Sequence, residues 1–270
     1  MLVEGWLLPT GRATTQSMET TLQPQEGSLE GWLQGPWVVG TVTTARGLAF
    51  LKAGTTSARL VEIRLDSLLE GGVPLSVVQA GLAERIRPAL LTLRLPEEGG
   101  RRRWAEGERG KLLDELFPLI DGLDMEYRSL SELREWWERA RSGKKWRILS
   151  VHWLEGSPGG DRILDQCSSM EREAPDWAKI ALRLREPEDL RSLVRVLLER
   201  RSQAWALMGV GPWAGLSRIV LSALGSELVY GYLDEPGAPG QPSVEELSDG
   251  LRRVGLAVSS EGRMMRAPRP

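Results

Sequence analysis

The sequence contains very little histidine or cysteine and no long apolar stretch. His152 is the only histidine and Cys167 the only cysteine in 270 residues. A single cysteine excludes an internal disulfide and suits a reducing compartment, and the two residues together exclude a zinc site built from cysteine and histidine. No stretch approaches the ~20 apolar residues of a membrane-spanning helix. Residues 1–8 carry no basic residue before their short apolar run, so we expect no secretory signal and a cytoplasmic protein.

The sequence also has little net charge. The formal charge is -2, with 27% charged and 41% hydrophobic residues, which is an ordinary globular balance. This composition gives no electrostatic reason to expect nucleic acid or an anionic membrane surface as a partner. We therefore expect small soluble partners, and the length permits one large core, since barrels of alternating strands and helices contain ~250 residues.

Lysine is scarce, with five lysines against thirty arginines. Four of them lie in polar or amphipathic surroundings: Lys52, Lys111, Lys144 and Lys145. The fifth, Lys179, lies inside the apolar run of residues 177–182. An ammonium group among apolar neighbours loses hydration, so its pKa falls and the free amine becomes available as a nucleophile. Such an amine is suited to forming a Schiff base with a carbonyl substrate.

His152 stands near the end of a second apolar run, residues 148–153, and is the only side chain with an ordinary pKa near neutrality. Taken alone, the histidine is more often a hydrogen-bonded core residue, and Lys179 is more often a lysine that reaches solvent from a strand end. Together, on neighbouring strands of one sheet, the two residues indicate a reactive site.

Short apolar runs alternate with helical patterns from residue 37 onward. The predicted strands are 37–43, 59–66, 89–94, 122–127, 147–152, 177–182, 203–208 and 227–232, and the predicted helices are 45–53, 75–85, 105–119, 129–141, 161–172, 187–200, 216–224 and 244–254. Alternation predicts a parallel sheet covered by helices, and eight repeats favour a closed (β/α)8 TIM barrel over residues 36–256. Residues 1–35 repeat Glu-Gly-Trp-Leu twice and are predicted to form a hairpin across one end of the barrel, and residues 257–270 a loose tail.

The active site of such a barrel lies at the carboxyl ends of its strands, where this sequence places charged residues. Glu62, Arg64 and Asp66 alternate along the second predicted strand and therefore share one face. Three charges on an inward face must be paired or bound to a ligand. The alternative is a solvated face on an edge strand, which a closed barrel does not have. On the third strand, Thr92 and Arg94 share a face in the same way.

Three further segments carry candidate residues. Asp124 and Glu126 could orient the lysine or balance arginines. A glycine-rich loop leads into a helix that carries Arg218, which could bind a substrate carboxylate through two of its guanidinium nitrogens. The loop is a weak phosphate motif because it matches neither glycine fingerprint for nucleotides. The turn at 237–241 could bring the Gln241 amide to the barrel mouth, although a purely structural turn explains it equally well.

These residues occur in an order that resembles the type I 3-dehydroquinate dehydratase family. The resemblance covers about residues 36–250. The matching pieces are Glu62-Ile63-Arg64-Leu65-Asp66, Thr92-Leu93-Arg94, Glu98-Gly99-Gly100, Asp124-Met125-Glu126, Ser150-Val151-His152, Lys179-Ile180-Ala181, Met208-Gly209, Leu216-Ser217-Arg218, Gly225-Ser226 and Ala238-Pro239-Gly240-Gln241.

The resemblance implies a (β/α)8 homodimer without metal, nucleotide or other cofactor. It implies a reaction of the shikimate pathway, in which 3-dehydroquinate loses water to give 3-dehydroshikimate. Lys179 would form the Schiff base, His152 would transfer protons, and Glu98 would assist the histidine. The positions that would bind substrate are Glu62, Arg64, Arg94, Met208, Arg218, Tyr230 and Gln241.

Two positions depart from the family pattern, and several alternatives stay open. Gly237 stands where the family commonly has serine, and the loop from Met208 to Arg218 is longer than usual. A barrel lyase or aldolase could use the same lysine on another keto acid. A catalytically idle barrel could serve as a binding module through its N-terminal tryptophans. The reaction could serve biosynthesis or the breakdown of quinate.

Overall fold

The computed structural model describes residues 36–54, 56–256 and 258. The hairpin predicted at 1–35 and the tail predicted at 257–270 lie outside the described residues, apart from Val258.

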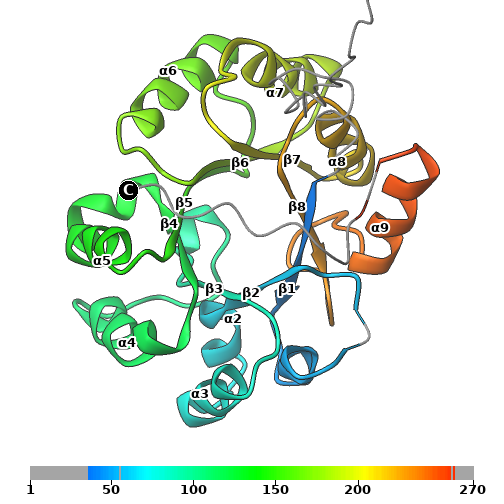
Figure 1. Ribbon diagram of the computed structural model, residues 1–270. Helices are drawn as coiled ribbons and strands as arrows, with labels where there is room; N and C mark the ends of the chain where they lie inside the picture. Colours follow the sequence, from blue (N-terminus) through cyan, green and yellow to red (C-terminus); the bar gives the residue numbers. More distant parts are fainter. Residues whose placement is uncertain (1–35, 55, 257, 259–270) are drawn as a thin grey trace, which may run out of the picture.

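Eight parallel strands form the centre of the molecule, with helices around them (Figure 1). The strands are β1 (Trp37–Val42), β2 (Leu60–Arg64), β3 (Ala89–Thr92), β4 (Gly122–Glu126), β5 (Trp146–Trp153), β6 (Trp177–Arg183), β7 (Trp205–Val210) and β8 (Leu228–Tyr232). Their hydrogen-bonded order is β7-β6-β5-β4-β3-β2-β1-β8. Strands that are consecutive in sequence are therefore neighbours in space, which confirms the predicted barrel.

The helices lie on the outside of the strands (Figure 1). They are α2 (Leu65–Glu70), α3 (Leu75–Ala83), α4 (Glu108–Leu116), α5 (Leu130–Ser142), α6 (Gly160–Glu171), α7 (Pro187–Glu199), α8 (Ala214–Ala223) and α9 (Val244–Arg253). Four short 3₁₀ segments join them: η1 (Arg46–Leu51), η2 (Pro96–Glu98), η3 (Phe117–Leu119) and η4 (Tyr127–Ser129). The predicted helix at 45–53 is only the 3₁₀ segment η1, and α2 replaces the end of the predicted strand at 59–66.

Two helices begin at the residues that their sequences indicate. Pro187 occupies the first turn of α7, where the missing N–H of proline is tolerated, and Glu186 forms a capping box with Asp189. Ser243 caps α9, because its hydroxyl accepts a hydrogen bond from the Glu246 amide at 3.1 Å while the Glu246 carboxylate accepts one from the Ser243 amide. These caps fix where the chain turns back after β6 and β8.

Side chains alternate along each strand between two apolar cores. One core lies between the strands and the helices, and the other fills the barrel interior. At the amino ends of the strands the interior is filled by Trp37, Trp146 and Trp177, with ring centroids 5.8 Å apart for the first and third and 6.4 Å for the second and third. Farther along the strands the inward positions become polar. The fold thus places an aromatic floor beneath a polar mouth.

The barrel closes between β7 and β8 through a mixed set of hydrogen bonds. The Glu227 amide donates to the carbonyl of Trp205 at 2.8 Å, and the amide of Leu207 donates to the Ser226 hydroxyl at 2.9 Å. At the mouth, Arg218 from α8 donates to carbonyls on both strands. A buried arginine therefore completes the seam where the strand ladder stops.

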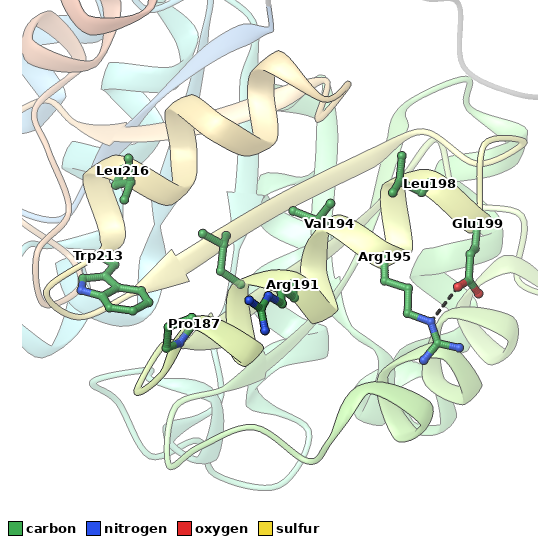
Figure 2. Close-up of a pocket in the computed structure, with 9 residues that line it drawn as sticks. Pro187, Arg191, Val194, Arg195, Leu198, Glu199, Trp213 and Leu216 are labelled. Carbon is green, nitrogen blue, oxygen red and sulfur yellow. Dashed lines mark hydrogen bonds and ion pairs between the residues drawn. The ribbon is translucent and has the colours of Figure 1, made fainter.

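An apolar groove lies on the outer surface between α7 and α8 (Figure 2). Its volume is about 430 Å³, and Leu198 and Leu216 are exposed in it. Trp213 lies at one end of the groove, and Arg195, which is paired with Glu199, lies at the other (Figure 2). Leu198 belongs to α7 and Leu216 to α8, so the groove joins the faces of two neighbouring helices.

Cys167 is buried in α6, and burial raises the pKa of its thiol to about 12. Among the helices of residues 36–256, none has the length and apolar content needed to cross a bilayer.

Candidate active site

Lys179 lies inside the barrel on β6, with only 3% of its surface exposed. Its Nζ atom is 2.7 Å from Oδ2 of Asp124 and 3.4 Å from Oε1 of Glu62. It also lies 4.0 Å from the centroid of the Tyr230 ring. The prediction that the Lys179 amine has apolar neighbours is therefore wrong for the Nζ atom itself. The apolar run holds the backbone, while strands across the barrel supply carboxylates and a ring face that stabilise a cation.

His152 lies on β5, beside the strand that carries Lys179. In the ladder, His152 pairs with Ala181 and Ser150 pairs with Lys179, so the amine lies deeper than the imidazole. Burial lowers the pKa of His152 well below 6.5, and the positive charges of Arg94 and Lys179 lower it further. The imidazole is therefore neutral at pH 7 and close enough to Lys179 to sense its charge.

Glu98 orients the imidazole from η2. Its Oε2 atom is 2.9 Å from Nδ1 of His152 and accepts the His152 backbone N–H at 3.1 Å. With the hydrogen on Nδ1, the lone pair of Nε2 is free to take a proton. Burial raises the pKa of Glu98 to about 7, although Arg94 opposes this rise. The other oxygen of Glu98 is 3.0 Å from Nε of Arg128, an exposed side chain after β4.

Arg94 holds the carboxylates of neighbouring strands in place. Its Nη2 is 2.8 Å from Oδ1 of Asp124, and its Nη1 donates to the hydroxyl of Ser150 at 2.7 Å. Burial alone would raise the pKa of Asp124, but Arg94 and Lys179 hold it below its usual range. Asp124 is therefore a fixed anion. Glu62 completes the network by accepting from the Thr92 hydroxyl at 2.8 Å.

Arg64 ends β2 and is held by Asp66, which belongs to the first turn of α2. Two hydrogen bonds of 2.9 Å join the guanidinium to the carboxylate. Asp66 therefore does not continue the inward face of the strand, as its spacing had predicted. It acts as the partner that orients Arg64, which also donates to the carbonyl of Gly99 at 3.2 Å.

Arg218 is a buried cation held by carbonyl groups. Its Nε donates to the carbonyl of Tyr230 at 2.8 Å, and its Nη1 donates to those of Gly209 and Ala214 at 2.8 and 2.9 Å. Among the described residues, no carboxylate is paired with it. Burial alone lowers its pKa to about 10. A buried positive charge without a counter-ion favours an anionic ligand.

The two loops at this side of the mouth are fastened to each other. Gly211, after β7, donates its N–H to the carbonyl of Pro239 at 3.0 Å. Gly240 has a positive φ of 73°, and a Cβ there would lie 2.2 Å from the Gly211 carbonyl oxygen, so the close approach requires glycine. The Gln241 amide is held by the Gly237 N–H at 2.8 Å and donates to Thr41 at 3.3 Å.

The residues that the sequence singled out thus lie around one mouth, on strands β2 to β8 or on the segments that follow them. Met208 on β7 and Tyr230 on β8 complete the wall, and both belong to the interior core. Sequence reasoning missed Arg128 as the partner of Glu98, and Ser150 as the link between Arg94 and Asp124. Both follow the rule that polar residues at the carboxyl ends of barrel strands line the site, and that rule applied to β4 and β5 would have found them.

The fold and the site define a class of protein: a (β/α)8 barrel that encloses a buried amine on β6 and a neutral imidazole on the neighbouring strand β5, an arrangement typical of enzymes that act on carbonyl compounds. Among the described residues, no group of three or more histidine, cysteine or acidic side chains could hold a metal ion.

Comparisons with known proteins narrow this class. A family model described as type I 3-dehydroquinase matches residues 39–257, so the chain belongs to the type I 3-dehydroquinase family. The 3-dehydroquinate dehydratase of Methanocella arvoryzae is 30% identical over 82% of this chain and 98% of its own length. That of Thermococcus onnurineus is 34% identical over 81% of this chain and 98% of its own.

A solved structure supports the fold. The crystal structure of the type I 3-dehydroquinate dehydratase from Clostridium difficile has a TM-score of 0.71 to this chain. The likeness covers 82% of this chain and 93% of that one, at 22% identity.

Proposed function

We propose that this chain is a 3-dehydroquinate dehydratase, a hydro-lyase that converts 3-dehydroquinate into 3-dehydroshikimate and water, with residues 36–256 as its catalytic domain. The observation that carries the proposal is the position of the Lys179 amine beside neutral His152 in a chain of this family.

Lys179 begins the reaction as the nucleophile. Its ammonium group first loses one proton, after which the nitrogen lone pair attacks the ketone carbon. The carbonyl oxygen takes up that proton and a second one from the nitrogen and leaves as water, so an iminium cation remains. The carboxylates of Glu62 and Asp124, 3.4 and 2.7 Å from Nζ, stabilise that cation where it forms. The cation withdraws electrons from the neighbouring carbon, so its C–H bond becomes acidic.

His152 takes the proton that the iminium has made acidic. Its neutral imidazole accepts the proton at Nε2, while Glu98 holds the N–H at Nδ1. The resulting enamine expels a hydroxyl group, and the protonated imidazole returns its proton to make water. Hydrolysis of the imine then releases the enone product and the free lysine.

The remaining side chains bind the substrate. Arg218, a buried cation without a carboxylate partner among the described residues, holds the ring carboxylate. Glu62 and Arg64 contact ring hydroxyl groups. The other positions that we assign to the substrate are Arg94, Met208, Tyr230 and Gln241, all at the same mouth.

We also propose that the protein is a cytoplasmic homodimer that acts in the shikimate pathway. The family supports the pathway, and the resemblance supports the dimer and the compartment.

The experiment that tests the function is reduction by borohydride during turnover. Incubation with 3-dehydroquinate and borohydride is expected to attach the ligand to Lys179, located by digestion and mass spectrometry, and to form a product that absorbs ultraviolet light. Lys179→Ala is expected to abolish labelling. The matched control is His152→Ala, which keeps the amine and is expected to be labelled while turning over at least ~100-fold more slowly. Full labelling of Lys179→Ala, or no enone from the wild type, would refute the proposal.

A further inference from the structure

The Tyr230 side chain combines two features in one place. Its ring faces Nζ of Lys179, with 4.0 Å between Nζ and the ring centroid. Its hydroxyl is buried, and no hydrogen-bond partner for it exists among the described residues. Only 2% of the residue is exposed, so bulk water does not satisfy the hydroxyl. An unpaired polar group therefore lies at the edge of the ring that covers the reactive amine.

The hydroxyl stays protonated in this position. Burial raises the pKa of Tyr230 well above 10, and the negative charges of Glu62 and Asp124 raise it further. The phenol is therefore protonated and a hydrogen-bond donor at neutral pH. A phenylalanine would present the same ring face to Lys179 and would have no hydroxyl to pair. Burying the tyrosine hydroxyl without a partner is unfavourable by comparison.

The missing partner follows from the chemistry at Nζ. When an amine adds to a ketone, the oxygen and the nitrogen are bound to the same carbon, so the oxygen lies next to Nζ. We propose that the Tyr230 hydroxyl donates a hydrogen bond to this carbinolamine oxygen and thereby positions it during formation and hydrolysis of the imine. The inference rests on the Schiff-base function proposed above and adds a role for one residue.

The step balances without any reactant other than water. In hydrolysis, a water oxygen forms a bond to the iminium carbon, the C=N electron pair returns to nitrogen, and the water proton passes to neutral His152. The nitrogen then takes up the proton held by His152, and the C–N bond breaks with its electrons staying on Lys179. The hydroxyl oxygen forms the C=O bond and passes its proton to the released amine. Tyr230 keeps its own proton throughout and acts through a hydrogen bond only.

The test compares Tyr230→Phe with the wild type by rapid quenching with borohydride. The rate at which the trapped adduct appears on Lys179 is expected to fall about tenfold, the scale of one hydrogen bond present in the transition state. Since imine formation then limits the rate, the isotope effect on kcat for substrate deuterated at the acidic carbon is expected to fall towards one.

The melting temperature of Tyr230→Phe is expected to stay equal or rise, because the lost hydroxyl had no partner among the described residues. Tyr127→Phe is the control, since Tyr127 packs between sheet and helices.

The outcomes are distinct. A rate of adduct formation within about twofold of the wild type overturns the inference, as does a slower kcat with an undiminished isotope effect, which would locate the hydroxyl at the C–H step. If the wild type itself forms no adduct at Lys179, the proposed function fails, and with it the role of Tyr230.

Discussion

Folding reverses the order of the pKa values of two neighbouring groups at the mouth, His152 and Glu98. Burial raises the pKa of Glu98 to about 7 and lowers that of His152 below 6.5. In the folded chain the proton taken up between pH 8 and 5 goes to the carboxyl, whereas in the unfolded chain it goes to the imidazole. The two effects on the free energy of unfolding therefore nearly cancel.

Replacing either His152 or Glu98 is expected to reveal how the pKa shift of the remaining group makes the free energy of unfolding depend on pH. In His152→Ala the folded state binds a proton at Glu98 that the unfolded state does not bind until about pH 4.5, so stability rises by about 2–3 kcal/mol as pH falls from 8 to 5. In Glu98→Gln the imidazole takes up a proton near pH 6.5 in the unfolded chain but not in the folded chain, so stability falls as the pH drops below 6.5. Urea unfolding at three pH values measures both slopes. Slopes of the same sign would contradict the assignment of the two pKa shifts.

Lys179 shows that a sequence can identify a reactive residue without identifying its neighbours in space. Scarcity and an apolar run were enough to select it. The atoms around Nζ belong to Glu62, Asp124 and Tyr230, which are distant in sequence and reach the amine only because the barrel closes. No pattern near residue 179 contains that information, so the apolar surroundings were predicted wrongly although the residue was selected.

At the scale of elements, the loops after β7 and β8 behave as one unit, since Gly211 and Pro239 are hydrogen-bonded and Gly240 packs on the Gly211 carbonyl. The Gln241 side chain is fixed to this unit through Gly237. The longer loop that the sequence indicates after β7 is therefore held by the loop that follows β8.

Gly237 offers a test of this unit. A Cβ at Gly237 would lie 3.4 Å from Oε1 of Gln241 and 3.9 Å from Nη1 of Arg64, which are ordinary contacts, so a serine fits without displacing either. Gly237→Ser is expected to add a hydroxyl at the substrate side of the loop, lower KM by about threefold to tenfold, and leave the pH optimum unchanged. Gly237→Ala is the matched control, since it adds the Cβ alone. Equal KM values for the serine and alanine variants would show that the hydroxyl makes no contact with substrate.

The strands and helices were predictable because apolar runs and caps are local signals. The pairs β6 and α7, and β8 and α9, begin within two residues of the predicted positions. Strand β2 was predicted too long because its alternating charges continue into Asp66. Asp66 lies in the first turn of α2 and binds the Arg64 guanidinium. Alternation alone cannot distinguish a third inward side chain from a side chain that pairs with the second.

At the scale of the whole molecule, eight repeats predicted a closed barrel, but not how it closes. The seam between β7 and β8 depends on the Ser226 hydroxyl and on Arg218, which also carries the charge that we assign to the substrate carboxylate. Binding of the substrate and closure of the barrel thus use the same guanidinium group. The sequence predicted Arg218 as a ligand for the substrate carboxylate, but not its part in closing the barrel.

The proposed homodimer is tested by the mass of the native particle. The groove between α7 and α8 leaves Leu198 and Leu216 exposed, an apolar surface of the kind that associates in solution (Figure 2). Light scattering at micromolar concentration is expected to give about twice the chain mass of 30.0 kDa. A mass of one chain at all concentrations would contradict the dimer.

The buried thiol of α6 gives the chain a built-in probe. Alkylating reagents attack the thiolate, and in the folded protein Cys167 is both enclosed and held in its protonated form by a pKa of about 12. Each modified molecule must therefore have opened first. Because the chain has a single cysteine, the speed at which an alkylated mass accumulates measures how often the barrel unfolds, without any engineered label.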